Sequence, residues 1–258
     1  MEKQEHTREG KIVEVDHLSL SFGDNHVLRD FSLSVEQGEN VVVLGKSGSG
    51  KSVLIKCIVR LMNADKGKIT VLGEDICALE REELDQLRRR MGFLFQSDAL
   101  YDSMTVRENL SFPLRTDEEE KSEEEKEKLI LEVLKNVGLE KTIDQYPSEL
   151  SGGMKKRISL ARTLMLKPEI IFYDEPTTGL DSITSAEISE LIVDIKKKYK
   201  TSALIISHDL YCAKTTADRI AVLIDGKCHA IGTYEELEKS DDEKVSQFFH
   251  HGHASKGK

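Results

Sequence analysis

Residues 45–52 read Gly45-Lys46-Ser47-Gly48-Ser49-Gly50-Lys51-Ser52 and match the pattern G-x-x-x-x-G-K-[ST]. They follow a continuous apolar run, Val41–Leu44, and open a stretch, Lys51–Leu61, that is typical of a helix. The glycines let the backbone wrap a polyphosphate, so that successive N–H groups and the helix N-terminus face its oxygens. We therefore predict a phosphate-binding loop in which Lys51 reaches the β- and γ-phosphates and the Ser52 hydroxyl coordinates Mg²⁺.

A second apolar run ends in two carboxylates, Ile170-Ile171-Phe172-Tyr173-Asp174-Glu175. Carboxylates at the C-terminal edge of a parallel sheet lie where ligands bind. Asp174 is expected to hold Mg²⁺ through water, and Glu175 to polarise the attacking water. Alone, this run is a weak signal, and a strand that ends in a surface turn is the default interpretation. Together with the phosphate-binding loop it indicates a nucleoside triphosphatase.

A third run, Leu150-Ser151-Gly152-Gly153-Met154, precedes a helical stretch that is rich in lysine and arginine. A serine and two glycines at the start of a helix make a second candidate anion site. One nucleotide does not need two phosphate clamps, so we expect this clamp to serve the nucleotide of another copy of the chain. The alternative is an ordinary serine N-cap.

The apolar patterns predict an α/β domain with a largely parallel sheet. Alternation around Leu18–Phe22 and Phe31–Val35 indicates half-exposed antiparallel strands, whereas Val41–Leu44 indicates a strand that is covered on both faces. Further expected elements are helices over Leu79–Arg90, 129–137 and Ser182–Tyr199, strands at Met91–Phe95, Ile170–Tyr173, Ala203–Ile206 and Ile220–Ile224, and a hairpin at Asp225-Gly226.

Charge and composition limit the classes of partner. The 258 residues carry a formal net charge of −10, and eight of the acidic residues lie in the segment 117–128. This segment is most simply the solvated start of the helix at 129–137, supported by i, i+4 pairs of acids with lysine. An acidic balance argues against sequence-independent nucleic-acid binding, so no nucleic-acid partner is expected.

Cysteine usage and hydropathy predict a cytoplasmic chain. The four cysteines are far apart and form no C-x-x-C pair, which is typical of free thiols in a reducing cytosol. Residues 1–11 contain no apolar signal-peptide core, and no run of eighteen apolar residues occurs, so no membrane span is expected. The histidines at 250, 251 and 253 have no accompanying acidic or cysteine cluster and are expected in a flexible tail.

In their order and spacing, these motifs resemble the ATP-binding cassette (ABC) ATPases. Leu150–Gly153 is similar to the family's signature, Ser207-His208-Asp209 contains its switch histidine, Gln96 matches its Q-loop glutamine, and Asp181 in Gly179-Leu180-Asp181 matches its D-loop. The resemblance covers about Ile12 to Phe249. It implies a P-loop (RecA-like) core over 12–96 and 168–235 with an N-terminal antiparallel β-subdomain, an inserted α-helical subdomain over 97–167 and a C-terminal tail over 236–258.

The resemblance also implies the site. ATP and Mg²⁺ are the cofactors, Lys51, Gln96, Glu175 and His208 are catalytic, and Ser52, Gln96 and Asp174 bind the metal. The nucleotide is held by Gly45–Ser52, by Ser151, Gly152 and Gly153 with Asp181, and by Phe22 at the position of an aromatic that stacks on adenine. Two positions depart from the family pattern: tyrosine is commoner than Phe22, and glutamine is commoner than Met154. A phenyl ring still stacks.

Within the family, Phe93–Leu100, Met104–Asn109 and Phe112-Pro113-Leu114 look like the Mla (maintenance of lipid asymmetry) group. This implies an energy-coupling subunit that dimerises, lies on the cytosolic face of the inner membrane, and drives an integral-membrane permease with a periplasmic lipid-binding subunit. Phospholipid is the expected substrate. The alternatives are import of amino acids or other small solutes, lipoprotein release, and a soluble ABC ATPase outside transport.

Overall fold

The computed structural model describes residues 10–116 and 121–250. Its centre is a six-stranded sheet in the order β10-β9-β3-β8-β7-β6, in which the pairs β9·β3, β3·β8, β8·β7 and β7·β6 are parallel and only the terminal hairpin β9·β10 is antiparallel. The predicted parallel sheet is confirmed. Its strands are β3 (Asn40–Leu44), β6 (Met91–Leu94), β7 (Ile170–Asp174), β8 (Ser202–Ser207), β9 (Arg219–Ile224) and β10 (Lys227–Gly232).

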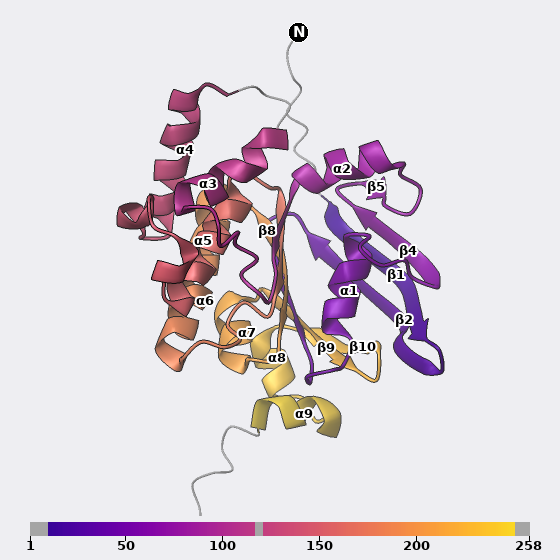
Figure 1. The fold of residues 1–258 in the computed structure, drawn as a ribbon. Coiled ribbons are helices and arrows are strands. Elements are labelled where there is room, and N and C mark those ends of the chain that lie inside the picture. The colour runs from indigo at the N-terminus through magenta and orange to yellow at the C-terminus, as the bar shows by residue number, and fades with distance from the viewer. Residues whose placement is uncertain (1–9, 117–120, 251–258) are drawn as a thin grey trace, which may run out of the picture.

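Both faces of this sheet are buried, because alternate residues of its strands point to opposite sides. In β3, Val42 and Leu44 belong to a core that the helices on one side complete, whereas Val41 and Val43 belong to a core shared with α1 (Lys51–Ile58) and a second sheet. Figure 1 shows the resulting layers, with α4, α5 and α6 on one side of the strands and α1 on the other.

The second sheet is antiparallel at all its pairings and has the order β2-β1-β4-β5. It consists of β1 (Lys11–Phe22), β2 (Asn25–Glu36), β4 (Lys66–Val71) and β5 (Glu74–Asp75). Leu18 and Phe31 are paired across β1 and β2 and are fully buried, as the alternation of the sequence predicts.

Two helices flank the junction of the sheets, and both are shorter than predicted. Helix α1 ends at Ile58 rather than at Leu61, since Arg60 takes a left-handed backbone conformation at φ 55°. Helix α2 spans Arg81–Arg89, inside the predicted Leu79–Arg90, because the Glu80 and Glu83 side chains form a capping box at its start.

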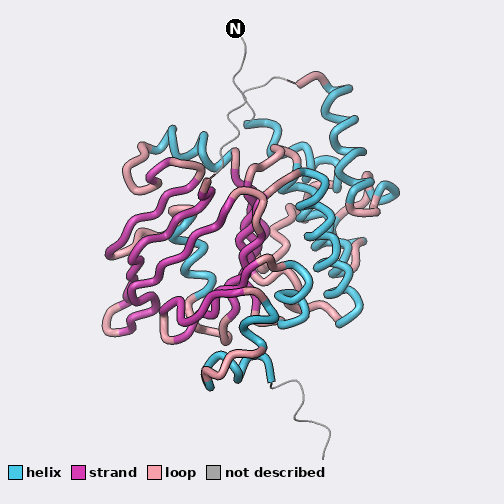
Figure 2. Tube along the Cα trace, turned by 180° about the vertical axis from the view of Figure 1, so that it is seen from behind, coloured by secondary structure: helices cyan, strands magenta, loops and turns pink. Residues whose placement is uncertain are grey.

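The segment between β6 and β7 is helical. It contains α3 (Val106–Ser111), α4 (Glu123–Asn136), α5 (Gly152–Leu164) and three short 3-10 helices at Phe112–Thr116, Glu140–Thr142 and Pro147–Glu149. Figure 2 shows these helices grouped on one side of the strands. Helix α4 begins with the Ser122 N-cap, so part of the acidic segment does start a helix; its Lys126–Glu123 ion pair is i, i+3 rather than the expected i, i+4.

The remaining helices are α6 (Ser182–Tyr199), α7 (Leu210–Thr216), α8 (Tyr234–Glu238) and α9 (Glu243–His250). Helix α6 has the predicted bounds. Within the expected C-terminal tail, Val245 and Phe249 of α9 are buried in the core. His251 and His253 lie outside the described residues. None of the described helices is long and apolar enough to cross a bilayer.

Candidate active site

The predicted phosphate-binding loop joins β3 to α1, with Gly50 as the N-cap of the helix. Gly48 and Gly50 have φ values of 78° and 101°, a region that side chains rarely adopt. At Gly50 an added Cβ would lie 2.7 Å from Val27 Cγ1. Glycine at this position lets the loop pack against β2.

Lys51 is buried, with its side chain 5% exposed. Its Nζ donates hydrogen bonds to the carbonyls of Gly45 at 2.8 Å and Lys46 at 3.0 Å, and it lies 3.2 Å from Glu175 Oε1. A buried ammonium group is stable only when it is paired and hydrogen-bonded. The loop carbonyls and Glu175, which follows strand β7, together meet that requirement.

Glu175 is the first residue after β7, and its backbone is left-handed at φ 52°. A non-glycine residue in this conformation is uncommon and often lies at a functional site. Its Oε2 accepts a hydrogen bond from His208 Nδ1 at 2.8 Å and a long one from Thr178 Oγ1 at 3.4 Å. The two carboxylate oxygens therefore contact different partners, Lys51 on one side and His208 on the other.

Asp174, the last residue of β7, is buried and accepts a hydrogen bond from Ser52 Oγ at 2.9 Å. Burial raises the pKa of the Asp174 carboxyl, while the Ser52 hydroxyl acts in the opposite direction. A partly desolvated carboxylate beside a hydroxyl is a fitting pair of ligands for Mg²⁺, which prefers one or two carboxylates together with phosphate and water oxygens. Among the described residues, no cluster of three or more histidine, cysteine or acidic side chains could hold a metal.

One cavity of about 400 Å³, called the phosphate cavity below, brings all four predicted catalytic residues together. Lys51, Gln96, Glu175 and His208 all line it. Ser47, Gly48, Gly50 and Ser52 of the loop line it as well. Sequence reasoning missed three of its residues, Val27, Val53 and Thr178. The position of Thr178 three residues after Glu175, in the same turn, is the signal that could have indicated it.

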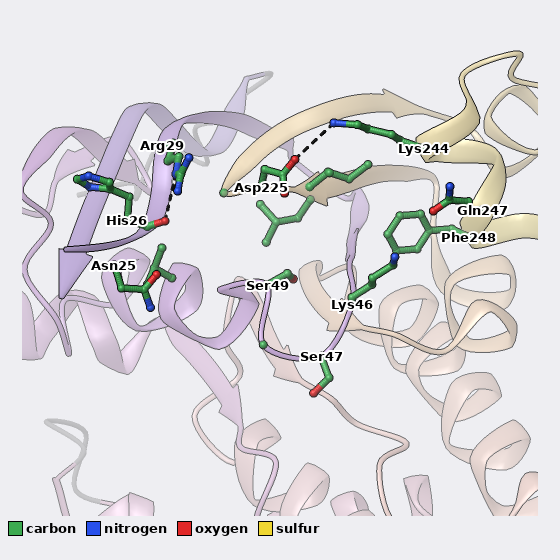
Figure 3. Close-up of a pocket in the computed structure, with 15 residues that line it drawn as sticks. Asn25, His26, Arg29, Lys46, Ser47, Ser49, Asp225, Lys244, Gln247 and Phe248 are labelled. Atoms are coloured by element: carbon green, nitrogen blue, oxygen red, sulfur yellow. Dashed lines mark hydrogen bonds and ion pairs between the residues drawn. The ribbon is translucent and has the colours of Figure 1, made fainter. Parts of the chain in front are cut away.

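A larger cavity of about 680 Å³ lies against the other side of the loop. Lys46 and Ser49 line it, and so do Gln247 and Phe248, which Figure 3 shows on the side of α9 toward the loop. Phe22, the expected adenine-stacking residue, lines neither cavity; it ends β1 with 49% of its surface exposed. An exposed ring beside the loop-contacting strand is free to stack on a base.

The signature and D-loop residues form a separate cluster. Ser151 is the N-cap of α5 and accepts a hydrogen bond from Met154 N at 3.3 Å. Added Cβ atoms at Gly152 and Gly153 would lie 3.7 Å from Leu180 and 2.6 Å from Thr184. Asp181 caps α6 by accepting hydrogen bonds from the backbone of Ile183 and Thr184 at 3.0 Å each, which lowers the pKa of its carboxyl. None of the residues Ser151, Gly152, Gly153 and Asp181 lines the phosphate cavity.

Three of the basic residues of α5 contact other parts of the chain rather than the N-terminus of the helix. Lys156 is buried, Arg157 donates to the Val137 carbonyl and pairs with Glu187, and Arg162 lies over the Tyr101 ring. Burial lowers the pKa of Arg162. The predicted anion site at Ser151, Gly152 and Gly153 therefore does not draw on these three side chains, which pack within the chain beyond the first turn of the helix.

A model of the family described as ABC transporter matches residues 28–178. The chain belongs to the ABC transporter family. The α/β architecture with two sheets and a helical insertion is that of the family's ATPase cassettes. One such cassette, MJ0796, was solved as a dimer in a post-hydrolysis state with ADP and Pi. It superposes on this chain with a TM-score of 0.78 at 31% identity, over 86% of this chain and 98% of that one.

Three relatives illustrate the range within the family. A probable ribonucleotide transport ATP-binding protein, mkl, of Mycobacterium tuberculosis H37Rv is 39% identical over 93% of this chain, which spans only 66% of that protein's length. The intermembrane phospholipid transport ATP-binding protein MlaF of Haemophilus influenzae is 37% identical over 92% of this chain and 89% of its own length. A methionine import ATP-binding protein, MetN, of Clostridium tetani is 35% identical over 88% and 70%.

Proposed function

We propose that this chain hydrolyses ATP and thereby drives a membrane transporter that moves phospholipids between the bacterial inner and outer membranes. The observation that carries the ATPase part is the single cavity at which Lys51, Gln96, Glu175 and His208 meet the phosphate-binding loop. The similarity to MlaF over nearly its whole length supports the lipid substrate.

The contacts give each residue a task. When nucleotide binds, Lys51 leaves Glu175 and pairs with the β- and γ-phosphates. Glu175 and the phosphates are all anions, and the buried ammonium group of the lysine can contact only a few partners at once. Asp174, Ser52 and Gln96 supply the oxygen ligands for Mg²⁺, which neutralises phosphate charge when bound. Glu175, released from Lys51 and held by His208, orients the attacking water and accepts its proton.

The second anion site indicates that two copies act together. Ser151, Gly152 and Gly153 open a helix away from the chain's own cavity, so we propose that they contact the nucleotide of the partner copy, with Asp181 beside them. The resulting assembly is a dimer with two nucleotides bound between the copies. Phe22 stacks on the adenine of the nucleotide in its own copy.

The remaining partners follow from the lipid assignment. We propose an integral-membrane permease, a periplasmic lipid-binding subunit and a peripheral position on the cytosolic face of the inner membrane. We propose that the segment 96–109 receives the permease. In it Tyr101 and Asp102 are exposed, whereas Asn109 is fully buried and Arg107 pairs with Glu127 and Asp144. Docking therefore uses the exposed residues of this segment.

The test is transport by the purified complex in vesicles. We expect labelled phospholipid to move from a vesicle to a carrier protein with ATP but not with a non-hydrolysable analogue. Asp102→Lys should reduce transport while the free subunit keeps its nucleotide affinity, and Asp241→Lys, an exposed acid outside this surface, is the control. ATPase activity that methionine stimulates and lipid does not would favour the import of a small solute, the substrate class of MetN.

A further inference from the structure

Helix α5 carries a buried lysine that the proposed reaction does not use. Lys156 lies just over one turn after the Ser151 N-cap, and 3% of its side chain is exposed. A lysine is almost never buried to this degree unless a partner compensates its charge. Its partners therefore show what the burial stabilises.

Both partners belong to the loop that follows β6. Lys156 Nζ donates a hydrogen bond to the backbone carbonyl of Gln96 at 3.0 Å and lies 3.0 Å from Asp98 Oδ1. Ser159, three residues further along α5, donates from Oγ to the backbone carbonyl of Asp98 at 2.6 Å. Residues at i and i+3 lie on one face of a helix, so a single face of α5 holds this loop at two points.

The loop needs such contacts to keep its shape. Phe95, Gln96 and Ser97 are exposed and lie outside any helix or strand, and Ala99 has a left-handed φ of 53°. An alanine in that region is strained and persists only where its surroundings hold it. The backbone of Gln96 is thus fixed from α5, while its side chain remains at the phosphate cavity.

We propose that Lys156 is a positioning residue for ATP hydrolysis, which ties the backbone of Gln96 to the helix that begins with the signature residues. The proposal rests on the assignment of Gln96 to the Mg²⁺ site. It means that a movement of α5, whose N-terminus faces the partner copy's nucleotide, also moves a ligand in the chain's own cavity. Lys156 acts through Gln96 and does not touch nucleotide.

The experiment is a double-mutant cycle on kcat, with Lys156→Met and Gln96→Ala, separately and combined, in the full chain. Lys156→Met keeps the length of the side chain and removes the charge. We expect kcat to fall about tenfold with KM for ATP within about twofold, because a misplaced catalytic group costs rate while the phosphate-binding loop is untouched. The Mg²⁺ concentration for half-maximal activity should rise, and Lys156→Arg should restore both values.

The double variant shows whether Lys156 affects kcat through Gln96. The double variant should be no slower than Gln96→Ala alone, because Lys156 has no effect once its target side chain is gone. Lys135→Met, which removes an exposed lysine of α4 in the same helical segment, is the control and should leave kcat and the Mg²⁺ dependence unchanged. If Lys156→Met does not fold, Ser159→Ala removes the second contact and should give a few-fold loss of kcat that is likewise absent in the Gln96→Ala background.

The two proposals fail differently. A wild-type kcat and Mg²⁺ dependence in Gln96→Ala would overturn the role of Gln96, and with it this inference. A slow Gln96→Ala beside a fully active Lys156→Met would leave the site assignment intact and overturn the role of Lys156. Additive effects of the two substitutions would also overturn it, because Lys156 would then act by another route.

Discussion

Two glycine-bearing turns open helices in this chain, and their surroundings differ. At Gly45–Ser52, two carboxylates and a histidine from other elements complete the turn: Glu175 contacts Lys51 and His208, and Asp174 contacts Ser52. At Leu150–Gly153, Ser151 is exposed, and its Oγ accepts only a long hydrogen bond within its own turn. The side chains at the first turn come together within one copy, whereas the second turn is exposed to solvent at Ser151 and Gly152. This difference is what a shared nucleotide site requires.

The strongest test of the first turn removes the proposed base. Glu175→Gln should lower kcat by about 10²-fold or more, because an amide cannot accept the proton of water. The variant should still bind ATP and should accumulate as an ATP-bound dimer, measured by turnover assay and light scattering. Asp194→Asn, an exposed acid on α6, is the matched control. Near-wild-type turnover of Glu175→Gln would remove Glu175 from the mechanism.

Lys51→Ala tests binding rather than chemistry at the same turn. A charge-assisted hydrogen bond contributes about 1.5–3 kcal/mol, so the Kd for ATP should rise about 10- to 100-fold. Isothermal titration with a non-hydrolysable analogue measures this directly. An unchanged Kd would show that the lysine contacts only Glu175 and the loop carbonyls, and not the nucleotide.

A mixing experiment tests whether the second turn serves the partner copy. Gly152→Asp is the suitable variant, since a side chain there makes ordinary contact with Leu180, whereas one at Gly153 would collide with Thr184. A 1:1 mixture of Lys51→Ala and Gly152→Asp chains should regain about a quarter of the wild-type rate, because half of the random dimers hold one intact site of two. A mixture as inactive as its components would contradict the shared site.

The smallest expected effect concerns the adenine. Aromatic stacking contributes about 0.5–1.5 kcal/mol, so Phe22→Ala should weaken ATP binding by no more than about tenfold. Phe22→Tyr should bind as the parent chain does. Competition between ATP and GTP further tests whether Phe22 contacts the base. If Phe22→Ala bound ATP with the affinity of the parent chain, the adenine would not stack on Phe22.

The sequence predicts most of the core because its signals are local. The unbroken apolar run Val41–Leu44 indicates a strand with two buried faces, and a capping aspartate before Ser182 marks the start of α6. The ion pairs of Arg107 and the burial of Lys156 could not be predicted in the same way. Their partners lie on other elements, and only packing decides whether a charged residue on a helix faces solvent or the interior.

The contact between Lys51 and Glu175 also sets how the site responds to ATP supply. In the proposed reaction a nucleotide that enters has to separate this ion pair, so the free energy of the pair is subtracted from that of binding. A pair that is formed in about nine molecules of ten weakens the apparent affinity about tenfold, since only the remaining fraction is ready to bind. Occupancy of the proposed site then follows the ATP concentration over a higher range instead of saturating early, so the ion pair that holds Glu175 at rest also makes the site responsive to changes in ATP supply.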